Sequence, residues 1–531
     1  MAFLSGLHGR KLNITMSVLA ALVFMMQGFD QALVNGLLTL DTWVKTFPGI
    51  DTVNTTGAVK EHNSKIQGLA VGIFEIGCAF GAVTLGFLGN RLGRRKNIFI
   101  GTCITGVGII LQASAFSLAQ LIVARFINGF GIGGITATVP MWVSECTRAS
   151  ERGRFVMLQG WFAIGGLVLV LWIEFGLYYV KTSSVNFRFP IAFQGVFALV
   201  IASGVFFMPE SPRWLVSRAE DVSERGGDGA VYLEKARQTL ARLIGGATTP
   251  QDASVADELA VMRHTLVAER QAHDSPSPFA LTHNRHLHRT MLAVAINMFA
   301  QMSGVSVVTF YSTTIFEQDL GFSGSVSRAV TGCLETWQFV AAGLSVLLID
   351  RFGRRPLLLL AATGMCISQF CLAGLSSDLT NKSVGSASVF FFFFALFFFP
   401  IGYFMVPFMY AAEIAPLRTR AAVAGLATAT NWLFSFAVAE ITPVAFASIG
   451  WKYYLVYGCI DAVAIVVIYT LYPETKGRTL EDLDEIFVQT KSIWETVKIA
   501  QEMPIGDVVT MSKMAEGQAK QEPVQHVEQV V

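Results

Sequence analysis

Acidic and basic side chains that could do chemistry stand inside apolar stretches of the chain. Asp30 lies in the middle of the first apolar run, and Arg125 lies early in a later one. A carboxyl group in such surroundings is energetically costly and is a functional candidate for that reason. Burial favours its neutral form and a neighbouring arginine favours its charged form, so an Asp30–Arg125 pair would decide whether Asp30 holds a proton. A permanent structural ion pair is the alternative.

Short basic turns separate the apolar runs, and their pattern occurs twice. The landmarks pair as Asn90 to Lys96 with Asp350 to Arg355, Glu145 to Arg154 with Glu413 to Arg420, and Pro209-Glu210-Ser211 with Pro473-Glu474-Thr475. Three landmarks in the same order indicate an internal duplication, so the chain consists of two similar halves. Arginines at helix ends can donate to the last carbonyls of a helix and pair with carboxylates on neighbouring helices.

The apolar runs predict an all-α membrane protein. Of 531 residues, 53% are hydrophobic and 15% are charged, and the mean hydropathy is +0.52. Stretches of about 20 apolar residues match the hydrocarbon core of a bilayer, and they must be helices because lipid offers no partner to a free backbone group. Twelve spans can be drawn, at about 16–38, 67–89, 98–115, 120–141, 155–179, 190–208, 291–316, 326–349, 357–376, 386–411, 421–447 and 451–472.

These spans predict five regions: an N-terminus (1–15), a six-helix bundle (16–208), a linker (209–290), a second six-helix bundle (291–472) and a tail (473–531). In the linker, 231–243 and 255–268 are expected to form short amphipathic helices. From Gln489 onward the tail is polar and lacks periodicity, so we expect it to be disordered.

Arginine and lysine placement predicts the orientation in a cell membrane. Basic residues concentrate in the loops after the second, fourth, eighth and tenth spans, so these loops, the linker and both termini are expected to be cytosolic. The sequons at Asn54 and Asn381 fall in predicted outside loops, where they are candidate glycosylation sites.

The chain resembles the sugar porter family of the major facilitator superfamily over roughly residues 16–487. The stretches that carry the resemblance are the two basic turns, Arg125 to Gly131, Glu145 to Arg154, Pro209 to Trp214, Gln301 to Gly304, Asn431-Trp432 and Pro473 to Gly477. Glu75 to Cys78, Trp172 to Phe175 and Phe187 to Phe193 are similar to the fungal branch, including its glycerol–proton symporters. The resemblance implies two pseudo-symmetric six-helix bundles that rock about a central site.

The resemblance also implies roles for single residues. In proton-coupled members, an acid at the position of Asp30 pairs with the arginine matching Arg125. The implied solute-binding positions are Gln159, Gln301, Gln338, Asn431 and Trp432, with Tyr311 as a gate. The implied cytosolic gating salt bridges involve Arg91, Arg95, Glu145, Arg152, Glu210, Arg351, Arg355, Glu413, Arg420 and Glu474. Positive-inside topology alone would explain these arginines but not the repeated glutamates.

Four further acids lie within or at the ends of spans, namely Glu75, Glu174, Glu335 and Glu440. Glu75 and Glu174 match motifs of the fungal branch, so we expect structural or auxiliary roles for them. Glu335 is less expected. It could hydrogen-bond sugar hydroxyls or be a second proton carrier.

Several amides that are usual in hexose carriers are absent. Gly160 stands where they have a glutamine, with Gln159 one residue away, and Ala300, Ser306 and Phe408 replace a glutamine, an asparagine and a tryptophan. A site opened by Gly160 need not bind glucose. We expect proton-coupled symport of a sugar or polyol. The alternatives are a carrier for an organic acid or secreted metabolite and a non-transporting nutrient receptor, for which the tail is short.

Other classes of protein are disfavoured. The seven cysteines show no metal or disulfide spacing, and no carboxylate or cysteine shares the spacing of His283, His286 and His288. The run from Gly129 to Gly134 matches a dinucleotide fingerprint, but no strand precedes it, so close helix packing is the better interpretation. No nucleophile–base constellation indicates an enzyme. We expect a monomer in the bilayer, with no cofactor, metal or nucleic acid.

Overall fold

The computed structural model describes residues 7–147, 152–245, 248–271, 279, 285–377, 382–416, 419–478 and 480–503. These ranges are helical with no strand, and twelve of their helices are long and apolar enough to cross a membrane, which confirms the all-α class. The spans are α2 (Gly9–Ala32), α4 (Gly57–Leu92), α5 (Arg94–Ala113), α6 (Leu118–Cys146), α7 (Arg152–Leu177), α8 (Val185–Val205), α12 with α13 (His286–Gln301 and Val305–Thr314), α14 (Gly324–Phe352), α15 (Arg354–Ser376), α16 with α17 (Lys382–Phe399 and Val406–Ile414), α18 (Arg420–Ile449) and α19 (Lys452–Leu471).

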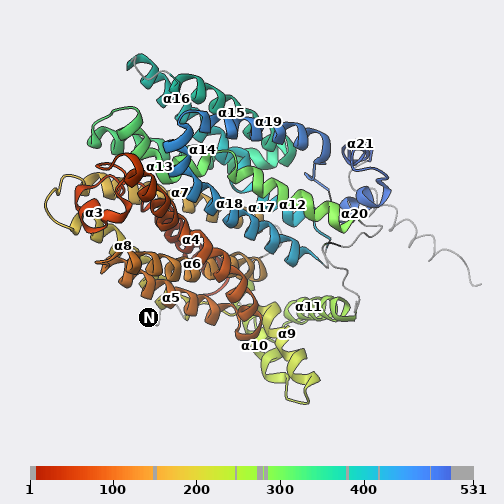
Figure 1. The fold of residues 1–531 in the computed structure, drawn as a ribbon. Helices are drawn as coiled ribbons and strands as arrows, with labels where there is room; N and C mark the ends of the chain where they lie inside the picture. Colours follow the sequence, from red (N-terminus) through yellow and green to blue (C-terminus); the bar gives the residue numbers. More distant parts are fainter. Residues whose placement is uncertain are drawn as a thin grey trace, which may run out of the picture.

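The first six spans form one bundle and the last six form another beside it (Figure 1). In the first bundle, α6 packs on α4 and α5, and α2 packs on α7. In the second, α15 packs on α16 and α19, and α12 packs on α18. Each bundle has its own hydrophobic core. The bundles meet where α4 packs on α18, α7 on α14, and the end of α2 on α13.

The glycines of α6 allow a very close approach to α4. A Cβ on Gly129 would lie 2.1 Å from the carbonyl oxygen of Phe74, and one on Gly133 would lie 2.0 Å from that of Cys78. Any larger residue would force the helices apart, so this run packs helices together, as the sequence predicted.

Two spans that we expected to be continuous are interrupted. Between α12 and α13 the chain turns at Gly304, whose φ of +88° favours glycine. Between α16 and α17 it widens into a π-helical turn, η3 (Pro400–Phe404). Irregular backbone at membrane depth is tolerated only where protein or a water-filled cavity surrounds it, so both breaks mark the interior of the protein.

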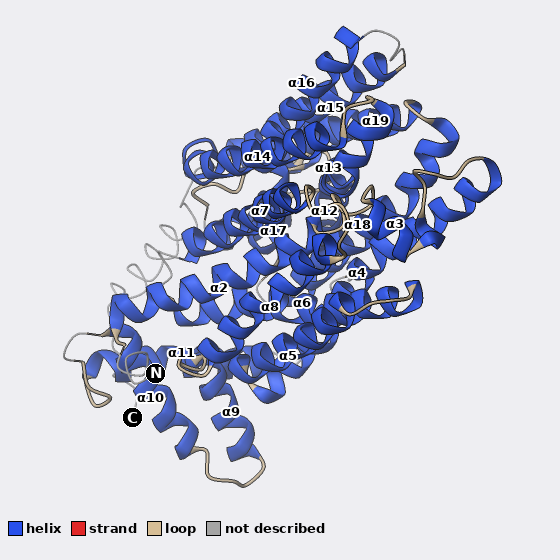
Figure 2. Cartoon of the chain, turned by 90° about the vertical axis from the view of Figure 1, so that its left-hand side faces the viewer, coloured by secondary structure: helices blue, strands red, loops and turns tan. Residues whose placement is uncertain are grey.

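Three helices follow the first bundle: α9 (Pro212–Glu224), α10 (Ala230–Ile244) and α11 (Ala253–Gln271). The two predicted linker helices correspond to α10 and α11, whereas α9 was not expected. It begins where Ser211 Oγ accepts a hydrogen bond from the Trp214 N–H (3.0 Å). All three lie at the end of the bundles opposite the short helix α3 (Asp41–Thr46), as Figure 2 shows.

The beginning of the tail is also helical. In α20 (Leu480–Gln489) and α21 (Thr496–Glu502), Leu483 and Ile486 pack against Ala500. The expectation of disorder from Gln489 onward is therefore wrong for α21. Its short length left no periodicity to detect, and its contact with α20 supplies the order.

Candidate functional site

Asp30 is fully buried on the face of α2 that looks into its own bundle. Asn128 Nδ2 on α6 donates to Asp30 Oδ2 (2.7 Å), and Gln194 Nε2 on α8 donates to Asp30 Oδ1 (3.1 Å). Neutral amides from two other helices therefore hold both carboxyl oxygens. The sequence did not single out these amides, because residues on distant spans share no spacing.

Arg125 lies near this carboxyl group without a hydrogen bond to it. Its Nη2 donates to the Val71 carbonyl (3.0 Å), and its guanidinium stands 5.4 Å from the centre of the Phe74 ring. Its Nε and Nη1 have no hydrogen-bond partner among the described residues, although the group is 1% exposed. Arg125 interacts electrostatically with both Asp30 and Glu75. A guanidinium with unused donors beside two acids can exchange one partner for another.

Predicted solute-binding residues meet at the break between α12 and α13. Gln301 Nε2 donates to Asn431 Oδ1 on α18 (3.2 Å), and Ser306 Oγ donates to Gln301 Oε1 (2.7 Å). Farther along α13, the Tyr311 hydroxyl donates to the Ala439 carbonyl of α18 (2.8 Å). The broken span is thus hydrogen-bonded to α18 at two levels, and the side-chain amides of Gln301 and Asn431 face each other.

Gln159 and Gln338 lie on α7 and α14, which pack across the two bundles. Both are 2% exposed, and within the described part of the chain neither amide atom of Gln159 has a hydrogen-bond partner, nor has Gln338 Oε1. Near them, the Trp161 ring stacks on that of Phe339 with centres 5.0 Å apart. Trp432, on α18, packs against the core of the first bundle. Buried amides with unused atoms fit the hydroxyl groups of a bound solute.

The expectation that Gly160 opens this region is wrong. A Cβ at Gly160 would lie 2.4 Å from both Cγ and Sδ of Met405, which follows η3 in the other bundle. The Met405 side chain fills the space, so this glycine permits a contact between the bundles.

The repeated glutamates of the Pro-Glu landmarks cap helices. Glu210 Oε1 accepts the backbone N–H of Arg94 (2.9 Å), the first residue of α5. Glu474 Oε1 accepts the backbone N–H of Arg354 (3.0 Å), the first residue of α15. A carboxylate at a helix N-terminus satisfies donors that the helix leaves free. Burial raises the pKa of Glu210, and its backbone N–H donors act in the opposite direction.

Two ion pairs occupy equivalent places in the bundles. Arg94 donates from Nε and Nη2 to Glu145 (both 3.1 Å), and Arg354 donates from Nη2 to Glu413 Oε1 (2.6 Å) and from Nε to its Oε2 (3.1 Å). Each pair joins helices of the same bundle. The sequence predicts salt bridges for Glu145 and Glu413 but does not select these two arginines, because adjacent arginines in one turn cannot be told apart by sequence.

The other predicted gating arginines are outside these two ion pairs. Arg91 and Arg351 are exposed, and Arg152 begins α7. Three others donate to backbone carbonyls: Arg95 to Val205 and Phe206, Arg355 to Tyr469, and Arg420 to Ala415. Arg95 and Arg355 therefore occupy the C-terminal ends of α8 and α19, where cations are favourable.

At the end of the bundles away from α9–α11, Arg328 joins the halves. Its Nη2 donates to the Gly36 carbonyl (2.9 Å) and to Thr39 Oγ1 (2.8 Å) beyond α2, and its Nη1 lies 3.4 Å from Glu317 Oε2. The guanidinium also stands 4.3 Å from the centre of the Tyr178 ring. An arginine at the start of a span gave no signal in the sequence.

Asn35 adds a second set of contacts there. Its Nδ2 donates to the Thr309 carbonyl (2.8 Å) and to Ser312 Oγ (2.9 Å), and its Oδ1 accepts the Thr313 N–H (3.0 Å). The bundles are therefore sealed at this end by buried hydrogen bonds.

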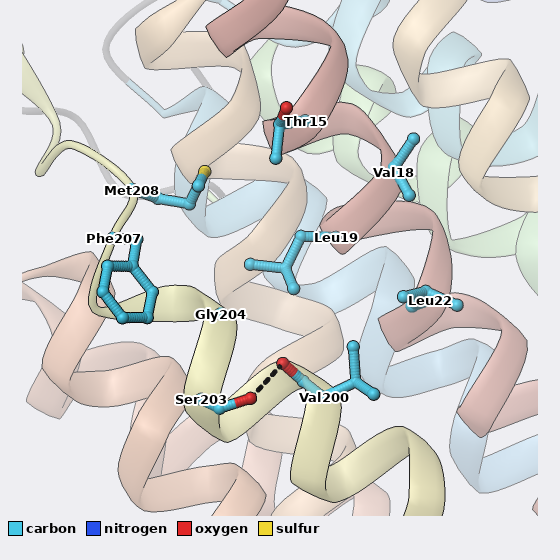
Figure 3. A pocket seen from close by; sticks show the side chains of 9 residues that line it. All are labelled: Thr15, Val18, Leu19, Leu22, Val200, Ser203, Gly204, Phe207 and Met208. Carbon is cyan, nitrogen blue, oxygen red and sulfur yellow. Dashed lines mark hydrogen bonds between the residues drawn. The ribbon is translucent and has the colours of Figure 1, made fainter. Parts of the chain in front are cut away.

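A groove of about 320 Å³ lies between α2 and α8 (Figure 3). Its lining is mostly apolar, with Thr15 and Ser203 as the exceptions, and none of the predicted site residues lines it. Within the described residues, no group of three or more His, Cys, Asp or Glu could hold a metal ion. Asn54 is exposed, and Asn381 lies outside the described residues.

Comparison with known proteins places this architecture. The model of the family described as sugar (and other) transporter matches residues 16–487. The sugar transporter STL1 of Saccharomyces cerevisiae is 33% identical over 91% of this chain and 83% of its own length, and the MFS-type transporter oryC of Aspergillus oryzae is 33% identical over 91% and 86%. The solved structure of the proton:xylose symporter XylE bound to 6-bromo-6-deoxy-D-glucose matches with a TM-score of 0.73 at 23% identity, over 90% of this chain and 99% of its own.

Two six-helix bundles about a polar interface define a major facilitator transporter. The chain belongs to the sugar (and other) transporter family, a family of membrane transporters and not of enzymes. This confirms the resemblance found in the sequence.

Proposed function

We propose that this protein is a proton-coupled symporter of a sugar or polyol, working by alternating access in a cell membrane with both termini in the cytosol. The observation that carries the proposal is Asp30, a fully buried acid held by two neutral amides beside an arginine that has donors to spare. The similarity to STL1, a sugar transporter, and to XylE, a proton:xylose symporter, supports it.

Asp30 and Arg125 would provide the coupling. When Asp30 is ionised, attraction draws the guanidinium toward it and away from the Val71 carbonyl. When Asp30 is protonated, the amides of Asn128 and Gln194 are enough to hold it, and Arg125 returns to the backbone of α4. Since α2, α4 and α6 are all involved, the protonation state would bias how the first bundle packs.

The solute would bind between the bundles. Gln301, Asn431 and Gln338 from the second bundle and Gln159 from the first would pair with hydroxyl groups. With the termini in the cytosol, the contacts of Arg328 and Asn35 close the outer end, so the structure corresponds to a state closed to the outside.

The test is uptake of labelled glucose, xylose, glycerol and sucrose in a host without hexose carriers, with and without a protonophore, while external pH is recorded. We expect saturable uptake with alkalinisation that the protonophore abolishes. Asp30→Asn should abolish accumulation but keep exchange of solute across the membrane. Accumulation against a gradient by this variant, at normal surface abundance, would refute the proton-coupling role.

A carrier for a non-sugar solute is the second candidate. Ala300, Ser306 and Phe408 stand where hexose carriers have a glutamine, an asparagine and a tryptophan, which favours this candidate. The side chain of Met405 fills the space beside Gly160, where hexose carriers have a glutamine, and this favours it as well. Uptake of quinate without uptake of any sugar or polyol would establish this candidate.

A further inference from the structure

One face of α14 carries a stripe of buried polar residues. Arg328, Thr331, Glu335 and Gln338 are each no more than 2% exposed and follow one another every three or four residues, so they share one face of the helix. Neither carboxyl oxygen of Glu335 has a hydrogen-bond partner among the described residues. A buried carboxyl group without a partner calls for an explanation.

Contacts before and after Glu335 show which way this face looks. Arg328, about two turns before it, donates to the Gly36 carbonyl of the first bundle. Ala342, about two turns after it, is part of the hydrophobic core of the first bundle. Glu335 lies on the same face between them, so it is turned toward the interface of the bundles.

Along α14, Glu335 also lies between Arg328 and the amide of Gln338. Arg328 and Asn35 form the hydrogen bonds that close the outer end, which we call the outer seal. Thr331, one turn toward the seal, lies 3.2 Å from Thr313 Oγ1. Gln338, one turn the other way, is a predicted solute ligand. A solute that enters through the outer end and reaches the amides passes this level.

We propose that Glu335 is a specificity-determining residue for the solute: its carboxylate accepts hydrogen bonds from the hydroxyl groups of a neutral sugar or polyol and excludes anionic solutes. This inference rests on the proposed function and narrows its substrate class.

Charge decides the selectivity. In the closed structure, burial without a partner favours the neutral form of Glu335, and water that enters when the bundles separate at this end favours the ionised form. The ionised carboxylate makes stronger hydrogen bonds to hydroxyl groups than an amide does, and it repels a second carboxylate. In this structure, Arg328 donates to the Gly36 carbonyl and to Thr39, and Arg125 donates to the Val71 carbonyl. Neither is bonded to Glu335, so neither offsets its charge toward a solute carboxylate.

The variant that tests this is Glu335→Gln, which keeps the shape and removes the charge. The matched control is Asp461→Asn. Asp461 is as buried as Glu335, and neither of its carboxyl oxygens has a hydrogen-bond partner among the described residues. It differs in its place, because it lies on α19, which packs on α15 within the second bundle. Exchange of labelled glucose, xylose and glycerol is measured in preloaded cells, normalised to surface abundance. Competition uses sorbitol and gluconate, which differ in one terminal group, an alcohol or a carboxylate.

We expect Glu335→Gln to raise the half-saturation concentration for exchange about tenfold and to strengthen inhibition by gluconate relative to sorbitol by about tenfold. The control should leave both unchanged. If Glu335→Gln does not reach the surface, Glu335→Asp should keep gluconate excluded while binding more weakly. If Glu335→Gln keeps the wild-type half-saturation concentration and still excludes gluconate, the inference is overturned. The same holds if this variant loses only accumulation of the solute, because that result would make Glu335 a proton carrier. A wild-type protein that exchanges none of the three solutes would refute the proposed function itself.

Discussion

Replacing Arg328 by glutamine should open the end of the transporter that we propose to face outward. The two hydrogen bonds from its Nη2 to Gly36 and Thr39 cross between the bundles at 2.9 and 2.8 Å and are lost when the bundles separate. Hydrogen bonds from a charged donor contribute about 1.5–3 kcal/mol each. Water replaces part of this in the open state, so we assign about 3 kcal/mol to the pair, which corresponds to roughly a 100-fold shift toward the open state.

The assay uses a reporter within the seal. Thr313, which is fully buried and bonded to Asn35, is replaced by cysteine in a background without the exposed cysteines, and labelling by a membrane-impermeant thiol reagent is timed. Arg328→Gln should accelerate labelling by one to two orders of magnitude. The matched control is Arg188→Gln, because Arg188 bonds carbonyls within the first bundle only. Equal labelling rates in wild type and Arg328→Gln would refute the reasoning.

Two further substitutions separate residues that look equivalent in the sequence. Arg94→Ala should lower the melting temperature of the purified protein by several degrees because it leaves the carboxylate of Glu145 unpaired, whereas the exposed Arg91→Ala should change it little; similar losses would contradict the assignment. Gly160→Ala should slow exchange by pushing against Met405, and Met405→Ala in the same chain should restore it; no restoration would mean that the two side chains are not coupled.

The capping of α5 and α15 illustrates what the duplicated landmarks do. Glu210 and Glu474 accept the first backbone N–H groups of helices that begin after Gly93 and Gly353, both with φ of +92°. The same chemistry at the same place in each bundle explains why these landmarks recur together. The recurrence concerns helix ends, so it says more about the architecture than about the solute.

The sequence by itself determined the class of fold. Apolar runs of bilayer length force helices, because lipid leaves a free backbone group no partner, and the repeated landmarks divide these helices into two halves. Two local signals in the sequence also agree with the structure. Asp30, which lies inside an apolar run, is fully buried, and the glycines of α6 pack closely on α4.

Only the tertiary structure decided which side chains meet. Sequence spacing relates residues within one helix, but Asp30 takes its partners from α6 and α8, and Arg328 takes its partners from the other bundle. The choice of Arg94 over Arg91, the filling of the space at Gly160 by Met405 and the break at Gly304 depend on packing between distant segments. Such contacts arise from the way helices lie against each other, which no local pattern encodes.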